Sequence, residues 1–164
     1  MIIGGFQKFS LIDYPEKISA IIFTRGCNFR CRYCHNPELV IPKKYAPKIP
    51  LFKIYDFLRR RQGKLDAVTI TGGEPTLHPD LIKVMEKIKD MGFLIKLDTN
   101  GTHPDVLRKL IDQNLVDYIA MDIKAPLKPE KYSLATGVSS ENFLKNILET
   151  IQILLSGKIP YEFR

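Results

Sequence analysis

The chain has 164 residues, of which 45% are hydrophobic and 26% are charged, the balance of a single globular domain with a buried core. It contains no apolar run long enough to span a bilayer, and its first residues lack the basic and apolar pattern of a signal peptide. The net charge of +7 is scattered, without the aromatic interleaving or motif of a nucleic-acid binder. We therefore expect a cytoplasmic protein that binds neither membranes nor nucleic acid, with a basic surface that faces solvent or an acidic protein partner.

Strand and helix patterns alternate along the chain after a short extended lead-in or hairpin over residues 2–14. The predicted strands cover residues 18–24, 67–71, 93–98, 117–122 and 159–163. The predicted helices begin at Pro50, at Pro79, at Pro104 and at Ser139 or Ser140, and prolines leave residues 37–50 without regular structure. This alternation indicates an α/β fold of parallel β/α units, either a doubly wound sheet or an incomplete barrel.

All three cysteines lie in the loop after the first predicted strand, as Cys27, Cys31 and Cys34 with the spacing C-x3-C-x2-C. Thiolates are soft ligands that suit iron–sulfur clusters or zinc. A structural zinc site normally has four protein ligands, and His35, directly after Cys34, closes a tetrahedron awkwardly. The spacing therefore favours a cluster with one iron left open for a substrate, with a zinc site or three ordinary buried thiols as alternatives.

The loop reads CNFRCRYCHNPEL, with the aromatic residue Tyr33 directly before the third cysteine. This string resembles the signature of the radical S-adenosylmethionine (SAM) superfamily, and its full length resembles the activating enzymes of glycyl radical enzymes. With the upstream run from Gly5 to Pro15, the chain is similar to the activating proteins of anaerobic ribonucleoside-triphosphate reductases, relatives of the pyruvate formate-lyase activating enzyme. The resemblance runs from about residue 4 to the last residue and departs at Glu16, where a glycine is expected.

The resemblance implies a partial (β/α) barrel of parallel strands with outer helices, of which about five strands are present. Because relatives continue past Phe163 and Arg164, we expect residues 1–164 to form a single radical SAM domain that lacks the last barrel strand or strands. We also expect it to bind SAM more weakly than a longer form does.

The cofactors that the resemblance implies are a 4Fe-4S cluster on the three cysteines, SAM on its open iron and, in some members, a monovalent cation. The implied activity is reductive cleavage of SAM to a 5′-deoxyadenosyl radical, which generates a glycyl radical on a partner enzyme, most plausibly an anaerobic ribonucleotide reductase. The electron would come from a reduced flavodoxin or ferredoxin. A radical SAM enzyme that acts on a small molecule, and a non-catalytic zinc-binding or cluster-binding module, are the alternatives.

Polar residues follow the carboxyl end of every predicted strand, which is the edge where α/β folds place their active sites. Gly72-Gly73-Glu74-Pro75 is either a plain turn or, by resemblance, a contact with the SAM amino group through carbonyls or Glu74. Asp98-Thr99-Asn100-Gly101 is either an Asx turn or, by resemblance, a contact with the ribose or carboxylate end of SAM.

Asp122 and Lys124 form either an ion pair or, by resemblance, contacts with the SAM carboxylate and ribose. Arg164 matches a family arginine near the SAM carboxylate, although its terminal position allows fraying, and Tyr33 matches an adenine contact. Among the histidines and their neighbours, His35 and Asn36 lie either near the cluster or in an exposed loop, whereas His78 and His103 are expected to cap helices or to be exposed. The predicted site comprises the metal ligands Cys27, Cys31 and Cys34 and the SAM contacts Tyr33, Gly72, Gly73, Glu74, Asp98, Thr99, Asn100, Asp122, Lys124 and Arg164.

Overall fold

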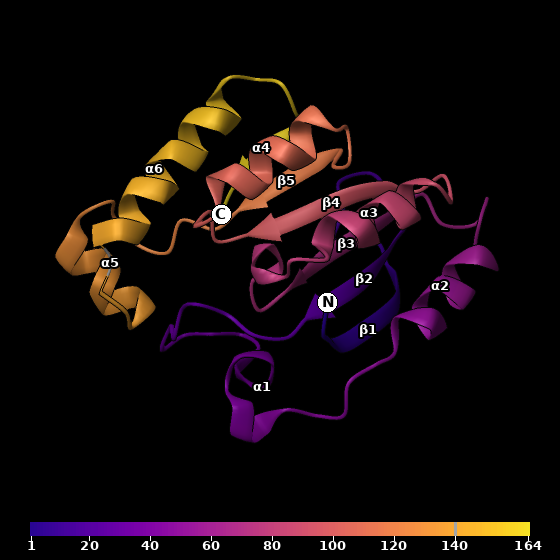
Figure 1. Ribbon diagram of the computed structural model, residues 1–164, viewed down its shortest axis with the longest axis horizontal. Helices are drawn as coiled ribbons and strands as arrows, with labels where there is room; N and C mark the ends of the chain where they lie inside the picture. The colour runs from indigo at the N-terminus through magenta and orange to yellow at the C-terminus, as the bar shows by residue number, and fades with distance from the viewer. Residues whose placement is uncertain (140) are drawn as a thin grey trace.

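The computed structural model describes residues 1–139 and 141–164, which form a six-stranded sheet with helices packed against it (Figure 1). The strands are β1 (Ile3–Ser10), β2 (Ser19–Thr24), β3 (Ala67–Gly72), β4 (Leu94–Thr99), β5 (Tyr118–Met121) and β6 (Tyr161–Phe163). They neighbour one another in chain order, β1 antiparallel to β2 and the others parallel. The predicted α/β class, a partial barrel with five parallel strands, is confirmed, and the extended lead-in is the antiparallel strand β1.

The helices after β2, β3, β4 and β5 return the chain to the start of the next parallel strand. They include α2 (Leu51–Arg59), α3 (Leu81–Lys89), α4 (Pro104–Asp112) and α6 (Glu141–Leu155). The helix starts predicted at Pro50, Pro79 and Pro104 are confirmed to within two residues. Of the two caps proposed for the last helix, Ser139 lies two residues before α6, and Ser140 lies outside the described residues.

One prediction about the connections was wrong, and one helix was not predicted. Residues 37–50 contain α1 (Pro37–Val40) and the 3-10 helix η1 (Pro42–Lys44), which are too short to show a periodic pattern. The second miss is α5 (Pro129–Thr136), which buries only two side chains, Tyr132 and Thr136, and so has no apolar stripe. A further 3-10 helix, η2 (Pro75–Leu77), follows the turn after β3.

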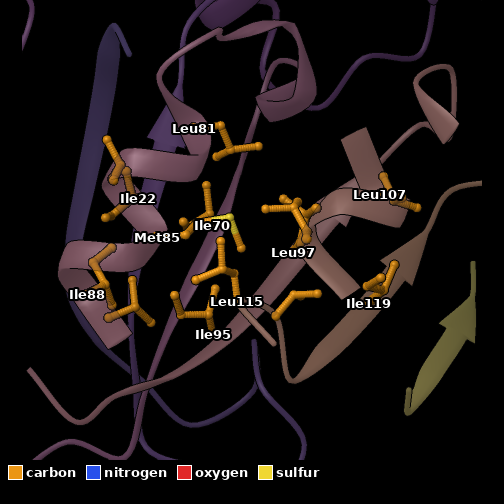
Figure 2. Packing of buried hydrophobic residues seen from close by; sticks show 14 of the residues in the cluster. Ile22, Ile70, Leu81, Met85, Ile88, Ile95, Leu97, Leu107, Leu115 and Ile119 are labelled. Atoms are coloured by element: carbon orange, nitrogen blue, oxygen red, sulfur yellow. The ribbon is translucent and has the colours of Figure 1, made fainter. Parts of the chain in front are cut away.

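The hydrophobic core lies between the sheet and the helices (Figure 2). Ile70 and Ile119 project from the strands and are fully buried, as are Met85 of α3 and Leu107 of α4. Successive side chains of a strand point to opposite faces, so the other face of β4 carries charged residues instead. The sheet therefore has an apolar face under helices and a polar face that leads to the carboxyl ends of the strands. Among the described helices, none is both long and apolar enough to cross a membrane.

Candidate functional site: the cysteine loop and the strand ends

A cavity of about 620 Å³ opens at the carboxyl ends of the strands. In Figure 1 the cysteine loop, α5 and the C-terminus all lie toward the arrowhead ends of the strands. Every residue of the predicted site lines this cavity: Cys27, Cys31, Tyr33, Cys34, Gly72, Gly73, Glu74, Asp98, Thr99, Asn100, Asp122, Lys124 and Arg164. It is also lined by Asp13, Phe23, Phe29, His35, Asn36, Val40, Thr71 and Ile123. From first to last, these residues span more than a hundred positions of the sequence, and the parallel sheet brings them together at the carboxyl ends of its strands.

Backbone hydrogen bonds fix the cysteine loop against the turn that follows β3. The Glu74 N–H donates to the Gly26 carbonyl over 2.8 Å, and the Gly26 N–H donates to the Leu39 carbonyl over 2.7 Å. A Cβ at Gly73 would collide with the Gly26 backbone, so only glycine permits this approach. The Arg30 N–H donates to the Thr136 carbonyl at the end of α5 over 2.7 Å. The helix that sequence analysis missed thus helps to hold the loop.

The three cysteines are free and partly buried around the cavity. Burial raises the pKa of the Cys27 thiol to about 11, with smaller contributions from Glu74 and the other two thiols, so Cys27 is neutral at physiological pH. Because a metal takes up the thiolate, loading the site would release this proton.

The donor set fits an iron–sulfur cluster. Among the residues that the structure describes, no three His, Cys, Asp or Glu side chains are grouped so that they could hold one metal ion. A 4Fe-4S cluster does not require such a group, because each thiolate binds a different iron. Three soft thiol ligands from one loop that lines the cavity therefore suit a cluster of this kind.

Glu74 is fully buried and accepts hydrogen bonds on both carboxylate oxygens. One oxygen accepts from the Thr76 N–H, the Thr76 hydroxyl and the Thr99 hydroxyl over 3.0, 2.6 and 2.8 Å, and the other accepts from the Asn100 N–H over 2.7 Å. Burial raises the pKa of Glu74, and these hydrogen bonds oppose the shift. The carboxylate is thus held within the protein by four hydrogen bonds.

Both interpretations of the turn after β4 are compatible with the structure. The Asn100 Oδ1 accepts from the Thr102 N–H over 3.1 Å, which is an Asx turn, and the same segment lines the cavity. His103 is the N-cap residue of α4, as expected, but its side chain does not make the cap hydrogen bond, and its Nδ1 lies 3.0 Å from the hydroxyls of both Thr76 and Thr102. His78 is not the N-cap of α3, which is Asp80.

Ion pairs connect the charged residues of the site. Lys124 Nζ lies 2.7 Å from Asp122 Oδ2, so the ion pair that the sequence left open is formed. The Arg164 guanidinium bridges Asp98 and Asp122 at 3.2 Å each. Its backbone is also paired, since the Arg164 N–H donates to the Met121 carbonyl over 2.9 Å. Arg164 is therefore anchored through its backbone and its side chain and is not frayed.

Tyr33 and His35 lie on the more exposed side of the cavity. The Tyr33 side chain is 51% exposed, and its hydroxyl donates to the Lys124 carbonyl over 2.6 Å. This bond ties the cysteine loop to the segment after β5 and leaves the ring along the cavity wall. His35 is exposed, which matches one of its two expected positions.

Lys96 is the site-associated residue that sequence analysis missed. It is only 3% exposed, and its Nζ donates to the Asp13 carbonyl over 2.7 Å. The same nitrogen lies 3.2 Å from Asp98 Oδ1 and 3.3 Å from Glu162 Oε1. The signal was available, because Lys96 and Asp98 alternate with Ile95 and Leu97 and so had to share the polar face of the strand.

Comparisons with known proteins agree on the family. Residues 21–161 match the family model of the Radical SAM superfamily. The chain is 38% identical over 165 residues to a protein of Methanocaldococcus jannaschii that carries the name of a glycyl-radical enzyme activating enzyme. The aligned region covers 99% of this chain and 67% of the relative. It is 30% identical over 153 residues to the pyruvate formate-lyase-activating enzyme of Streptococcus mutans, and this aligned region covers 87% of this chain and 57% of that enzyme.

The fold has solved counterparts. The structure of SuiB from Streptococcus suis bound to S-adenosylmethionine matches with a TM-score of 0.66 at 15% identity, over 87% of this chain and 32% of that chain. This likeness shows the fold alone.

The chain spans 57% to 67% of the length of the two curated relatives. The superfamily implies a 4Fe-4S cluster and SAM as cofactors. The chain belongs to the radical SAM superfamily and, within it, to the family of glycyl-radical enzyme activating enzymes.

Proposed function

We propose that this protein cleaves SAM reductively and uses the resulting radical to abstract a hydrogen atom from a backbone glycine of a partner enzyme. The observation that carries the proposal is the meeting of three free thiols, two close-packed glycines and a set of paired charges around one cavity. Cavities of this size hold small-molecule cofactors. The family membership supports the same activity.

We assign Cys27, Cys31 and Cys34 as the ligands of the 4Fe-4S cluster. When bound, the cluster supplies the electron that splits the sulfonium of SAM into methionine and a 5′-deoxyadenosyl radical. The other contributions of the protein are to bind SAM, to orient it and to exclude water. Hydrogen transfer from glycine to the radical gives 5′-deoxyadenosine and leaves the unpaired electron on the glycine α-carbon, so the step balances.

The remaining residues bind the two charged groups of the amino acid end of SAM and its adenosine end. The Gly72 and Gly73 carbonyls accept hydrogen bonds from its ammonium group, and Lys124 and Arg164 attract its carboxylate. The ring of Tyr33 packs against the adenine, since an aromatic face suits stacking with a base. In a radical SAM enzyme these contacts would hold the sulfonium close to the cluster, which is an orientation effect.

Asp98 and Asp122 are assigned to the ribose hydroxyls and to a monovalent cation. Carboxylate oxygens are hard ligands suited to such ions, and Arg164 bridges the same two carboxylates in this structure. We expect potassium or sodium chloride to raise the affinity for SAM above that measured in choline chloride at equal ionic strength. Calorimetric titration in the three salts tests this, and equal affinities would remove the cation from the proposal.

The partners that we propose are an anaerobic ribonucleotide reductase as the glycyl radical enzyme and a flavodoxin or ferredoxin as the electron donor. The support is the likeness of the motifs around Cys27 and the positive net charge of the chain, which suits an acidic electron carrier. Incubation with candidate glycyl radical enzymes, SAM and reductant tests the first partner, through the doublet that a glycyl radical gives in electron paramagnetic resonance.

The first experiment is electron paramagnetic resonance of protein reconstituted anaerobically with iron and sulfide and then reduced, recorded with and without SAM. We expect a cluster signal that changes when SAM is added, together with release of 5′-deoxyadenosine. Stoichiometric zinc without a cluster would overturn the proposal in favour of a binding module. If the cluster responds to SAM but no candidate reductase acquires a glycyl radical, the result would favour a small molecule as the substrate.

A further inference from the structure

Asn100 lies at the centre of a buried hydrogen-bond network that joins the cysteine loop to both neighbouring strand-end turns. Its side chain is buried, with 4% exposure. Its backbone N–H donates to Glu74 over 2.7 Å, which fixes it to the turn after β3. Its side-chain Nδ2 lies 2.8 Å from Asn28 Oδ1 and 3.9 Å from Cys27 Sγ. The residue therefore contacts three segments of the site from one position.

The orientation of the Asn100 amide is determined by its partners. The Thr102 N–H, which can only donate, lies 3.1 Å from Asn100 Oδ1, so this atom must be the oxygen. The Thr102 hydroxyl donates to the same oxygen over 2.7 Å. The NH2 group therefore faces the cysteine loop, where one hydrogen is directed at Asn28 Oδ1 and the second is available to Cys27 Sγ.

The same reasoning fixes the neighbours of Asn100. The Thr102 hydroxyl accepts from Asn28 Nδ2 over 2.9 Å and gives its own hydrogen to Asn100. The Thr76 hydroxyl gives its hydrogen to Glu74, so His103 Nδ1 must carry the hydrogen that both threonine hydroxyls accept. The hydrogen-bond directions of these neighbours agree with the orientation of the Asn100 amide that the Thr102 N–H requires.

We propose that Asn100 is a positioning residue that directs an amide N–H at the Cys27 sulfur and thereby raises the reduction potential of the cluster. The inference rests on the proposed function, because it requires a cluster at Cys27. A hydrogen bond to a ligating thiolate withdraws negative charge from the sulfur and so favours the reduced, more negative cluster. The backbone N–H of Phe29, 3.4 Å from the same sulfur, acts in the same direction.

The network also links the Cys27 sulfur to the turns that are proposed to bind SAM. Glu74 holds the Asn100 backbone, and Asn100 reaches Cys27, so the turn after β3 and the cluster ligand are linked through two residues. Loss of the Asn100 side chain removes the contact with sulfur but leaves the Glu74 hydrogen bond to the backbone intact. The substitution Asn100→Ala also removes the acceptor of the Thr102 N–H and hydroxyl, so its effect on the potential is compared with that of a second variant that removes a hydrogen bond to Thr102 without reaching the sulfur.

The test is a redox titration of reconstituted protein without SAM, followed by electron paramagnetic resonance. For Asn100→Ala we expect the ratio of reduced to oxidised cluster at a fixed solution potential to fall at least about threefold, which is about 30 mV for a one-electron couple. The matched control is Asn146→Ala, which removes an amide that donates to the Thr102 carbonyl. A potential unchanged in Asn100→Ala, or shifted equally in both variants, would overturn the proposal.

A second readout does not depend on the variant loading its cluster. Wild-type protein labelled with nitrogen-15 in the asparagine side-chain amides should show a nitrogen coupled to the reduced cluster by electron–nuclear double resonance, and Asn100→Ala should lose it. Absence of this coupling in wild-type protein overturns the inference even where Asn100→Ala fails to load. If the wild-type protein takes up no cluster, the proposed function fails instead, so the two failures are distinguishable.

Discussion

Glu74 joins the turn after β3 to the end of β4 through hydrogen bonds that it accepts on both oxygens. In Glu74→Gln, the amide NH2 must face a group that can only donate, because backbone N–H groups of Thr76 and Asn100 donate to different oxygens. We expect the free energy of unfolding to fall by about 2 kcal/mol, the usual cost of an unsatisfied buried donor. Urea denaturation measures this change.

The control for this prediction is Glu86→Gln, at an exposed position of α3. It should change the unfolding free energy by less than about 0.5 kcal/mol. Equal stability of Glu74→Gln and the wild-type protein would mean that the buried network tolerates a reversed amide.

Lys96 is the only cation within ion-pair distance of both Asp98 and Glu162 among the described residues. In Lys96→Met the aliphatic chain is kept, but the two carboxylates lose their buried partner. We expect a loss of about 2 kcal/mol, since Asp98 and the Asp13 carbonyl lose a buried charged donor, whereas Arg164 still pairs with Asp98 and Glu162 is partly exposed. Thermal unfolding measures it, with the exposed Lys83→Met as the matched control. A loss no greater than that of the control would show that solvent already screens these carboxylates.

At the scale of elements, β6 is held to β5 by backbone hydrogen bonds and by the Arg164 side chain. In Arg164→Gln the ion pairs with Asp98 and Asp122 are lost, whereas the strand pairing remains. We expect the Ile123 amide, which donates to the Arg164 carbonyl, to exchange its hydrogen about tenfold faster. Hydrogen exchange measured by mass spectrometry checks this.

The exposed substitution Arg60→Gln serves as the control, because it changes the same charge on the surface at the end of α2. Unchanged exchange at Ile123 in Arg164→Gln would mean that the backbone pairing alone holds the strand. In that case the ion pairs of Arg164 serve the site and not the sheet.

The regular elements could be predicted from the sequence because burial leaves a pattern on them. The strands β2 to β5 are buried along most of their length and so are short runs rich in apolar residues, whereas α2, α3 and α4 each carry an apolar stripe. By contrast, α5 is surface-bound with two buried side chains, so no period marks it. The lead-in β1 is an edge strand of mixed burial, and its pattern is correspondingly weak.

The composition of the site could also be predicted, but its hydrogen bonds could not. Cys27 and Asp122 follow strands and Asp98 lies near the end of β4, so the parallel topology alone brings them together. The roles of Glu74 and Asn100 depend on which way a side chain turns, and several residues far apart in sequence decide that direction. Sequence position therefore gave the lining of the cavity, and only the folded structure shows which groups remain free for a ligand.

At the scale of the whole molecule, the net charge of +7 bears on the electron donor. We expect the dissociation constant for a reduced flavodoxin or ferredoxin to rise at least about tenfold between about 50 and about 500 mM NaCl, because salt screens attraction between surfaces of opposite charge. Isothermal titration calorimetry measures the constants. A constant that does not change with salt would argue for an apolar contact.

Charge reversal locates this attraction on the molecule. Arg32 is exposed within the cysteine loop, and Lys64 is exposed just before β3, at the amino ends of the strands. Arg32→Glu should weaken binding of the donor, whereas Lys64→Glu should leave it nearly unchanged. Equal effects of both substitutions would show that the donor responds to total charge and not to a docking surface.

The order of the strands has a consequence for how the site is assembled during synthesis. Each strand pairs with the one made just before it, so the growing chain can extend the sheet one unit at a time. The cysteine loop emerges early, beside β2, whereas Arg164, which bridges Asp98 and Asp122, is placed only when β6 is added. The thiols can thus be in position before Arg164 joins the two carboxylates, which until then have Lys96 and Lys124 as their ion-pair partners.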